Sequence, residues 1–198
     1  LKPTSCRFPN IVTYNQPVVL TDPRTQSGPL ARSIEDLAFL LPIIAGVDYQ
    51  DAGVVPMPWR NPAAVHPEKL TVAYFAADPL SPVSNEIRHA VGASAQALAR
   101  AHVKVEQASP TDFVAAGREI DAFWQDMAGA PGRTVVEFYA LWDNFRSHLL
   151  HFMQPYDALL CPVTHQVAPL IHERDPRRFD DTIPFSLTGY PCVVTPVG

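Results

Sequence analysis

Apolar residues recur at intervals of three and four in several parts of the chain, the spacing that places side chains on one face of a helix. This pattern predicts helices at residues 33–46, 84–101, 111–128 and 134–154. In the first, Ser33 stands where an N-cap is expected, and Glu35 and Asp36 place negative charge in the first turn. Gly46 is the expected stop, and Pro42 is expected to bend the helix because proline has no backbone N–H. The last helix is rich in aromatic residues and is expected to lie in the core.

Short apolar runs between these helices predict strands. They are LTVAYF at 70–75, VKVEQA at 103–108, DALLCPVT at 157–164 and the run Cys192–Thr195. A helix between the first two runs makes a βαβ unit, which implies parallel pairing and a right-handed crossover. Residues 1–31 carry five prolines and allow at most a short VVL strand at 18–20. The expected fold class is α/β, with a mixed sheet flanked by helices.

Composition supports a globular chain with stiff connections. Of 198 residues, 47% are hydrophobic and 18% are charged, which is enough apolar material for a sizeable core. Proline is the unusual residue, with 21 copies against 9 glycines. Prolines at this density favour extended connections between elements over flexible linkers.

Charge and hydropathy exclude two classes of partner. The formal net charge is −5, and the densest basic run, RDPRR at residues 174–178, is interrupted by an acid and a proline. Nucleic-acid binding needs a concentrated basic face, so it is not expected. The longest uncharged apolar run, Leu37 to Val47, has eleven residues, whereas a membrane-spanning helix needs about twenty. No membrane association is expected.

The cysteines and histidines do not form a recognisable site. Cys6, Cys161 and Cys192 are an odd, scattered set, which is typical of a reducing compartment and indicates a cytoplasmic protein. Cys161 and Cys192 lie at the ends of apolar runs and are expected to pack as small hydrophobic residues. His148 and His151 have a spacing that suits two metal ligands, but no third ligand stands at a useful offset. No metal, no cofactor and no catalytic residue is assigned within this chain.

Five segments of the chain, taken in order, form a specific family signal, although each segment alone is a weak one. They are LKPTSCRFP, GPLARSIEDLAFLLPIIAGVD, LTVAYF, DALLCPVT and FSLTGYPCVVTPVG. Together they resemble the amidase signature family, whose members read G-L-K-P-T-x-G-R, then G-P-L-A-R-S-V-E-D, and later L-T-G-x-P. The resemblance covers essentially all of residues 1–198. It implies that the chain is the C-terminal portion of an amidase-signature domain, truncated at both ends, with an incomplete portion of that fold.

The resemblance also implies where the chemistry lies. In that family a Gly- and Ser-rich loop just before the G-L-K-P-T segment carries the nucleophilic serine, a second serine and the oxyanion-hole amides, and an earlier lysine completes the triad. The expected parent protein is therefore an amidase that hydrolyses carboxylic or aryl amide C–N bonds with a serine upstream of Leu1. The 198-residue chain alone is expected to be inactive. Its expected partners are a small-molecule amide, the missing N-terminal part of its own chain and, as a homo-oligomer, further copies of itself.

Two departures from the family pattern bear on this interpretation. Cys6 stands where the family has a glycine, and a glycine there would allow a positive φ that cysteine tolerates poorly. Thr25 stands where the tRNA-dependent amidotransferases of the family carry an aspartate, which favours a free-standing amide hydrolase. Two alternatives stay open, namely a non-catalytic binding or interaction module and a subunit of a glutamine-dependent aminoacyl-tRNA amidotransferase.

The resemblance also suggests a substrate-binding region. The segment FSLTGYP combines two rings, a hydroxyl and a glycine, and the matching stretch of the family lies beside the nucleophile. The loop after DALLCP is expected to lie nearby. The expected substrate-binding residues are Thr164, Phe185, Thr188 and Tyr190, whereas Leu187 and Val193 are expected to belong to the core.

Overall fold

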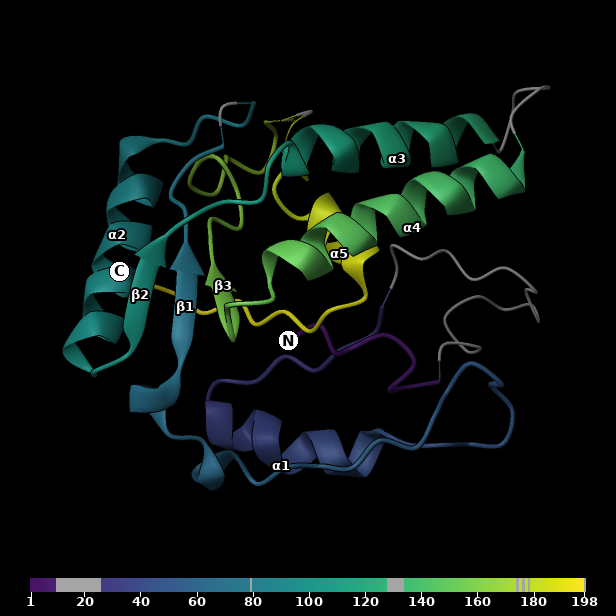
Figure 1. Ribbon diagram of the computed structural model, residues 1–198, viewed down its shortest axis with the longest axis horizontal. Coiled ribbons are helices and arrows are strands. Elements are labelled where there is room, and N and C mark those ends of the chain that lie inside the picture. The colour runs from purple at the N-terminus through teal and green to yellow at the C-terminus, as the bar shows by residue number, and fades with distance from the viewer. Residues whose placement is uncertain are drawn as a thin grey trace. The chain divides into compact units, whose positions relative to one another are not determined.

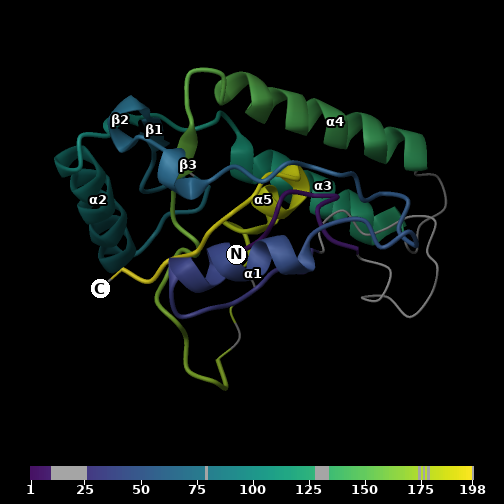
Figure 2. The ribbon, with the colours of Figure 1, turned by 90° about the horizontal axis from the view of Figure 1, so that it is seen from below.

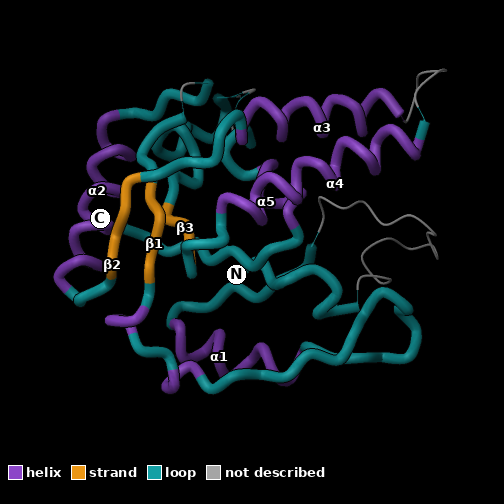
Figure 3. The backbone as a smooth tube through the Cα atoms, viewed as in Figure 1, coloured by secondary structure: helices purple, strands orange, loops and turns teal. Residues whose placement is uncertain are grey.

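Three parallel strands form the sheet of the computed structural model, in the order β2-β1-β3 (Figures 1 and 3). They are β1 (Thr71–Tyr74), β2 (Lys104–Gln107) and β3 (Ala158–Leu160). Val72 of the central strand pairs with Val105 on one side and with Ala158 on the other. The predicted βαβ unit and the α/β class are confirmed, and the described sheet is parallel throughout.

The structure describes residues 1–9, 26–78, 80–127, 134–173, 175, 177 and 179–197. The short VVL strand expected at 18–20 lies outside these residues. Two compact units are present: unit 1 is Leu1–Val65 with Gly189–Thr195, and unit 2 is His66–Thr188 with Pro196–Gly198. The sheet belongs to unit 2.

Helix α2 (Asn85–Arg100) connects β1 to β2 and packs against β2 (Figure 2). The hydroxyl of Ser84 caps it by accepting a hydrogen bond from the backbone N–H of Ile87 at 3.4 Å. Val91 and Ala95 are its buried residues, one turn apart on the face toward the core. The amphipathic pattern of this segment therefore predicted the helix and its N-terminus correctly.

Three further helices of unit 2 pack against one another and form an aromatic core. They are α3 (Phe113–Met127), α4 (Val135–Phe152) and α5 (Ile183–Thr188). Phe138, Ile120 and Leu187 are completely buried in the core of unit 2. The N-terminus of α4 has a capping box, in which Thr134 Oγ1 accepts from the N–H of Glu137 and the Glu137 carboxylate accepts from the N–H of Thr134.

Helix α5 and the chain after it differ from the sequence-based expectation. No helix was expected at 183–188, and the strand expected at Cys192–Thr195 is wrong. Cys192 forms only an isolated antiparallel bridge with Lys2, and Val193 is 51% exposed instead of buried. The physical reason is the pair of prolines at 191 and 196, because neither can donate to a ladder and together they limit the run to four residues.

Unit 1 contains helix α1 (Ile34–Ile44) and the short 3-10 helix η2 (Pro62–Ala64); a second 3-10 helix, η3 (Pro67–Lys69), begins unit 2. Leu37 is the buried residue of α1, whereas Phe39 and Ile43 are exposed. The helix ends at Ile44, ahead of the expected stop at Gly46, and Pro42 lies in its last turn. The bend expected at Pro42 stays a prediction.

The N-cap predicted for α1 is confirmed. Ser33 has an extended backbone, and its Oγ accepts a hydrogen bond from the N–H of Asp36 at 3.1 Å. We expect Ser33→Ala to lower the free energy of unfolding by about 1 kcal/mol, because this amide loses its acceptor. Chemical denaturation measures the loss, and Ser33→Thr, which keeps a hydroxyl, is the matched control. Equal stability of the alanine variant and the parent would contradict the cap.

No helix in the described parts of the chain is long and apolar enough to cross a membrane.

Candidate functional site

Two segments from opposite ends of the sequence meet in unit 1. The backbone N–H of Lys2 donates to the carbonyl of Cys192, and the N–H of Cys192 donates to the carbonyl of Lys2, both at 2.8 Å. A third bond runs from the N–H of Ser5 to the carbonyl of Gly189 at 2.9 Å. The LKPTSC and GYPC segments, which the sequence analysis singled out separately, therefore form one hydrogen-bonded junction.

A glycine permits the close approach of the two segments. Gly189 has a φ of 74°, in the left-handed region that disfavours side chains. A Cβ added there would lie 3.1 Å from the Ser5 hydroxyl oxygen, which is tighter than ordinary van der Waals contact. The glycine of the TGYP segment thus serves both the turn that follows α5 and the contact with Ser5.

Burial governs the electrostatics of the junction. Burial lowers the pKa of the Lys2 ammonium, and the same effect raises the pKa of the Cys192 thiol, with the nearby Lys2 charge opposing it. The Lys2 ammonium donates to the carbonyl of Tyr190. A thiol with a raised pKa is a poor nucleophile at neutral pH, which supports the expectation that Cys192 has no nucleophilic role. Cys192 and Cys161 are both half-buried, not fully enclosed in the core.

Cys6 lies in the turn that follows the junction and has a positive φ. Its φ is 63°, and its carbonyl accepts a hydrogen bond from the N–H of Val55 at 3.2 Å. The family places glycine at this position, and the sequence-based argument that the position calls for a positive φ is confirmed. The turn holds a cysteine in a conformation that costs energy for any side chain.

We expect Cys6→Gly to raise the free energy of unfolding by about 1 kcal/mol, because glycine adopts the left-handed conformation without the Cβ penalty. The Cys6 side chain is exposed, so its removal sacrifices little packing. Thermal and urea unfolding of the two proteins measure the difference. Cys6→Ala is the control, since it removes the thiol and keeps the Cβ. If both variants shift stability equally, φ is not the cause.

Two of the four expected substrate-binding residues lie on α5. Phe185 is half-buried, and its ring meets that of Phe113 edge to face with centroids 4.9 Å apart. Thr188 is 4% exposed, and its hydroxyl donates to the carbonyl of Phe185 at 2.9 Å. Leu187, between them, is completely buried, so its assignment to the core is confirmed. The structure therefore brings Phe185 and Thr188 together on one short helix.

The other two lie apart from α5 in the chain. Thr164 is half-buried in the loop after β3, and Tyr190 is half-buried in unit 1, where its carbonyl accepts from Lys2. The two cavities that the structure describes in unit 1 are lined by other residues of that unit. The substrate-binding role of Thr164, Phe185, Thr188 and Tyr190 stays a prediction.

A polar cluster of low exposure in unit 2 was not anticipated from the sequence. His165 Nε2 lies 2.9 Å from Asp175 Oδ2, which also accepts from Gln166 Nε2 at 3.0 Å. His165 Nδ1 and Asp181 Oδ2 are buried without a hydrogen-bond partner among the described residues. These residues are scattered between polar loop positions, so no spacing signals their meeting. His148 and His151, by contrast, are exposed, and the described residues contain no group of three potential metal ligands.

Burial raises the pKa of the Asp181 carboxyl, with a hydrogen bond from Ser81 opposing the effect. The folded state therefore binds this proton more tightly than the unfolded state, and stability falls as the pH rises from the unfolded-state pKa through the folded-state pKa. We expect Asp181→Asn to be more stable than the parent at pH 7, with the difference shrinking as the pH approaches about 3. Urea titrations across this range measure it. A stability difference between Asp181→Asn and the parent that does not vary with pH would contradict a raised pKa of Asp181. Asp112→Asn, at an exposed position, is the control.

Comparison with solved structures shows the fold. Fatty acid amide hydrolase matches with a TM-score of 0.71 and 22% identity, over 95% of this chain and 39% of that one. A glutamyl-tRNA(Gln) amidotransferase subunit from Thermotoga maritima matches with a TM-score of 0.72 and 19% identity, over 95% and 48%. 6-Aminohexanoate cyclic dimer hydrolase complexed with substrate matches with a TM-score of 0.67 and 22% identity, over 95% of this chain and 51% of that one.

The chain thus spans between about two fifths and half of the length of these structures. No curated protein sequence matches it. The family model described as Amidase matches residues 1–130. Because that match covers 130 of the 198 residues, and the fold agrees with it, the chain belongs to the Amidase family.

Proposed function

We propose that the chain forms part of an amidase that hydrolyses carboxylic or aryl amide C–N bonds by a serine nucleophile upstream of Leu1 in the sequence. The observation that carries the proposal is the junction in unit 1, where reciprocal bonds between Lys2 and Cys192 join two family motifs. Membership of the Amidase family supports the reaction class. Amide hydrolysis needs a nucleophile, a proton relay and an oxyanion hole. The junction would hold the LKPTSC segment beside the upstream loop that is proposed to carry these groups.

Within this proposal the 198 residues contribute acyl-chain contacts and not the bond-breaking groups. A small-molecule amide is the proposed substrate, and Thr164, Phe185, Thr188 and Tyr190 are the proposed contacts. The proposed reaction uses no cofactor or metal. The scattered cysteines support a reducing, cytoplasmic location. Exposed apolar residues of α1, including Phe39 at 75% and Ile43 at 64%, support self-association of the isolated chain.

The direct test is release of ammonia or amine from a panel of aliphatic and aryl amides by a polypeptide that contains the sequence upstream of Leu1. Hydrolysis is expected, with loss of activity when the upstream serine is replaced by alanine, and the 198-residue chain alone is expected to be inert. Tyr190→Ala should raise KM or shift acyl preference, whereas Val193→Ala, at an exposed neighbouring position, should not. Activity that survives removal of the serine would refute the proposed nucleophile.

A second candidate function has one observation in its favour, the fold likeness to an amidotransferase subunit. The likeness to amide hydrolases is equally strong, so the fold does not separate the two. Glutamine-dependent amidation of aminoacyl-tRNA in the presence of candidate partner subunits would favour the amidotransferase. Hydrolysis of simple amides without any partner would favour the hydrolase.

A further inference from the structure

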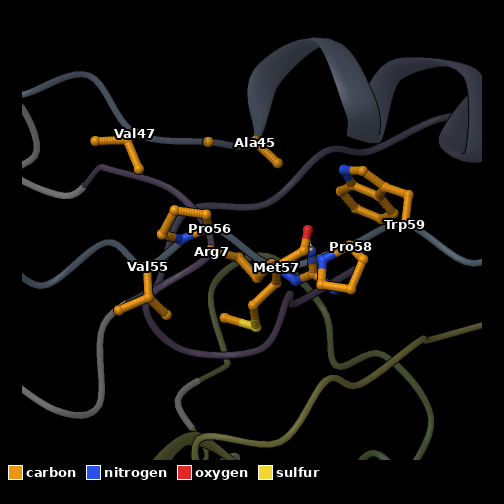
Figure 4. Close-up of a pocket in the computed structure, with 9 residues that line it drawn as sticks. Arg7, Ala45, Val47, Val55, Pro56, Met57, Pro58 and Trp59 are labelled. Atoms are coloured by element: carbon orange, nitrogen blue, oxygen red, sulfur yellow. Dashed lines mark hydrogen bonds between the residues drawn. The ribbon is translucent and has the colours of Figure 1, made fainter.

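A second place in unit 1 has the chemistry of a small-molecule site. A cavity of about 380 Å³ is lined by residues that directly follow α1, by Arg7 after the turn containing Cys6 and by the VVPMPW segment (Figure 4). Its walls are mostly apolar, and one charged side chain, Arg7, lies among them. Ligand pockets are usually apolar with a few placed polar groups, in a range of about 300–1,000 Å³. This cavity is at the small end of that range.

Two contacts hold the Arg7 guanidinium in place. Its Nη1 donates to the carbonyl of Met57 at 2.9 Å, and its central carbon lies 4.5 Å from the centroid of the Trp59 ring. A guanidinium over an aromatic face is attracted by the electrons of the ring, and its remaining N–H groups lie in a single plane. The group is therefore oriented before any ligand arrives, which reduces the entropy lost on binding.

The charge of Arg7 is not paired with an acid within the described parts of the chain. The carboxylates nearest in sequence to the lining segments are engaged with their own loop. Asp48 Oδ1 accepts from the N–H groups of Gln50 and Asp51, and Asp51 Oδ1 accepts from the N–H of Gly53. A guanidinium with free in-plane donors matches a carboxylate, which it can bind through two parallel hydrogen bonds.

The walls define the rest of the ligand. Val55, Met57 and Trp59 offer aliphatic and aromatic surface, and Pro56 and Pro58 stiffen the segment that carries them. A phosphate dianion is a poor fit to this cavity, because its two charges need more than one cation and it has no apolar part to contact the walls. We propose that the cavity binds a carboxylic acid with a short aliphatic or aryl body, its carboxylate on Arg7 and its body against Trp59, Met57 and Val55.

This site is separate from the junction and does not depend on the proposed amide hydrolysis, because binding is measured without turnover. Isothermal titration of the 198-residue protein with hexanoate and benzoate is expected to show saturable binding. The neutral isosteres hexanamide and benzamide are expected to bind about tenfold more weakly, because they lack the charge that Arg7 recognises.

Four variants test the assignment. Arg7→Met is expected to weaken carboxylate binding about tenfold, and Arg7→Lys to weaken it by less, since lysine keeps the charge without the fork. Arg60→Met is the matched control, because Arg60 is exposed beside Trp59 and does not line the cavity. Val55→Trp fills the cavity from a half-exposed position and leaves Arg7 intact, so it tests the site if Arg7→Met fails to fold.

Carboxylate binding that is lost in Arg7→Met and Val55→Trp but kept in Arg60→Met supports the proposal. Three results would overturn it: no saturable binding of either acid, equal binding of acids and amides, or equal losses in Arg7→Met and Arg60→Met. Equal binding of acids and amides would indicate a purely apolar cavity. Equal losses in Arg7→Met and Arg60→Met would indicate that the overall charge of the protein, and not Arg7 in particular, attracts the carboxylate.

Discussion

Replacing Phe138 with alanine is expected to lower the free energy of unfolding by about 3–5 kcal/mol, the largest effect of any single substitution considered for this chain. Phe138 is completely buried at the first inward position of α4. Its ring lies 6.0 Å from that of Phe123 on α3 and 5.9 Å from that of Trp142. Removing it opens a cavity among rigid rings, which cannot collapse to fill the space.

Urea or thermal unfolding followed by circular dichroism measures the loss. Val136→Ala is the matched control, because Val136 is two residues away on the same helix and is 77% exposed. Its expected effect is within about 0.5 kcal/mol of zero. If Phe138→Ala behaves like the control, α4 does not contribute its aromatic face to the core of unit 2.

Replacing Gly117 with alanine is expected to destabilise the protein by about 2 kcal/mol, although alanine is the better helix former. Gly117 lies on α3 where α5 crosses it. A Cβ added there would lie 2.6 Å from Cγ of Pro184 and 3.3 Å from its Cα. A proline ring and a backbone atom cannot move aside as a flexible side chain can, so the two helices would have to separate.

The same substitution at Gly92 is expected to have the opposite sign. Gly92 is in the middle of α2, and nothing lies within 4 Å of an added Cβ. There the alanine should stabilise the protein by about 0.5–1 kcal/mol through helix propensity alone. A pair of unfolding curves compares the two variants directly. Stabilisation by both alanines would mean that α3 and α5 are not in close contact at Gly117.

The helices and the parallel strand pair could be predicted because their signals are local. Ser33 was predicted as an N-cap and is confirmed, and the helix expected from Ser84 begins there, with Ser84 as its N-cap. In the strand-helix-strand order over residues 70–108 the helix returns the chain to the end where the first strand began, so parallel pairing is expected, and the register of β1 with β2 agrees with it. Likewise, the glycine that the family places at the position of Cys6 indicated a positive φ that the backbone shows.

The errors occur where tertiary contacts outweigh the local pattern. The run at Cys192–Thr195 is apolar and β-branched, yet its partner is a single residue, Lys2, and Val194 is 62% exposed. Helix α5 has only six residues, too few for a periodic pattern to indicate a helix. It exists because Pro184 and Leu187 are buried against the rest of unit 2.

The candidate sites also combine features that have a local sequence signal with features that only tertiary contacts reveal. The motif segments at the two ends of the sequence could be recognised singly, but only the hydrogen bonds between Lys2 and Cys192 show that they meet. Neither the position of the Arg7 guanidinium over the Trp59 ring nor the contact of His165 with Asp175 has a sequence spacing that signals it. Pro56 and Pro58, which precede Trp59, are the one hint, since they mark a stiff segment able to present a ring.

The discontinuous make-up of unit 1 has a consequence for synthesis on the ribosome. Unit 1 combines Leu1–Val65 with Gly189–Thr195, and Lys2 and Tyr190 are 188 residues apart in the chain. Translation at about 5–20 residues per second therefore separates the two halves of the junction by roughly ten seconds or more. The continuous His66–Thr188 segment of unit 2 is therefore complete before residues 189–195 of unit 1 are made. The reciprocal hydrogen bonds between Lys2 and Cys192 can form only after that interval.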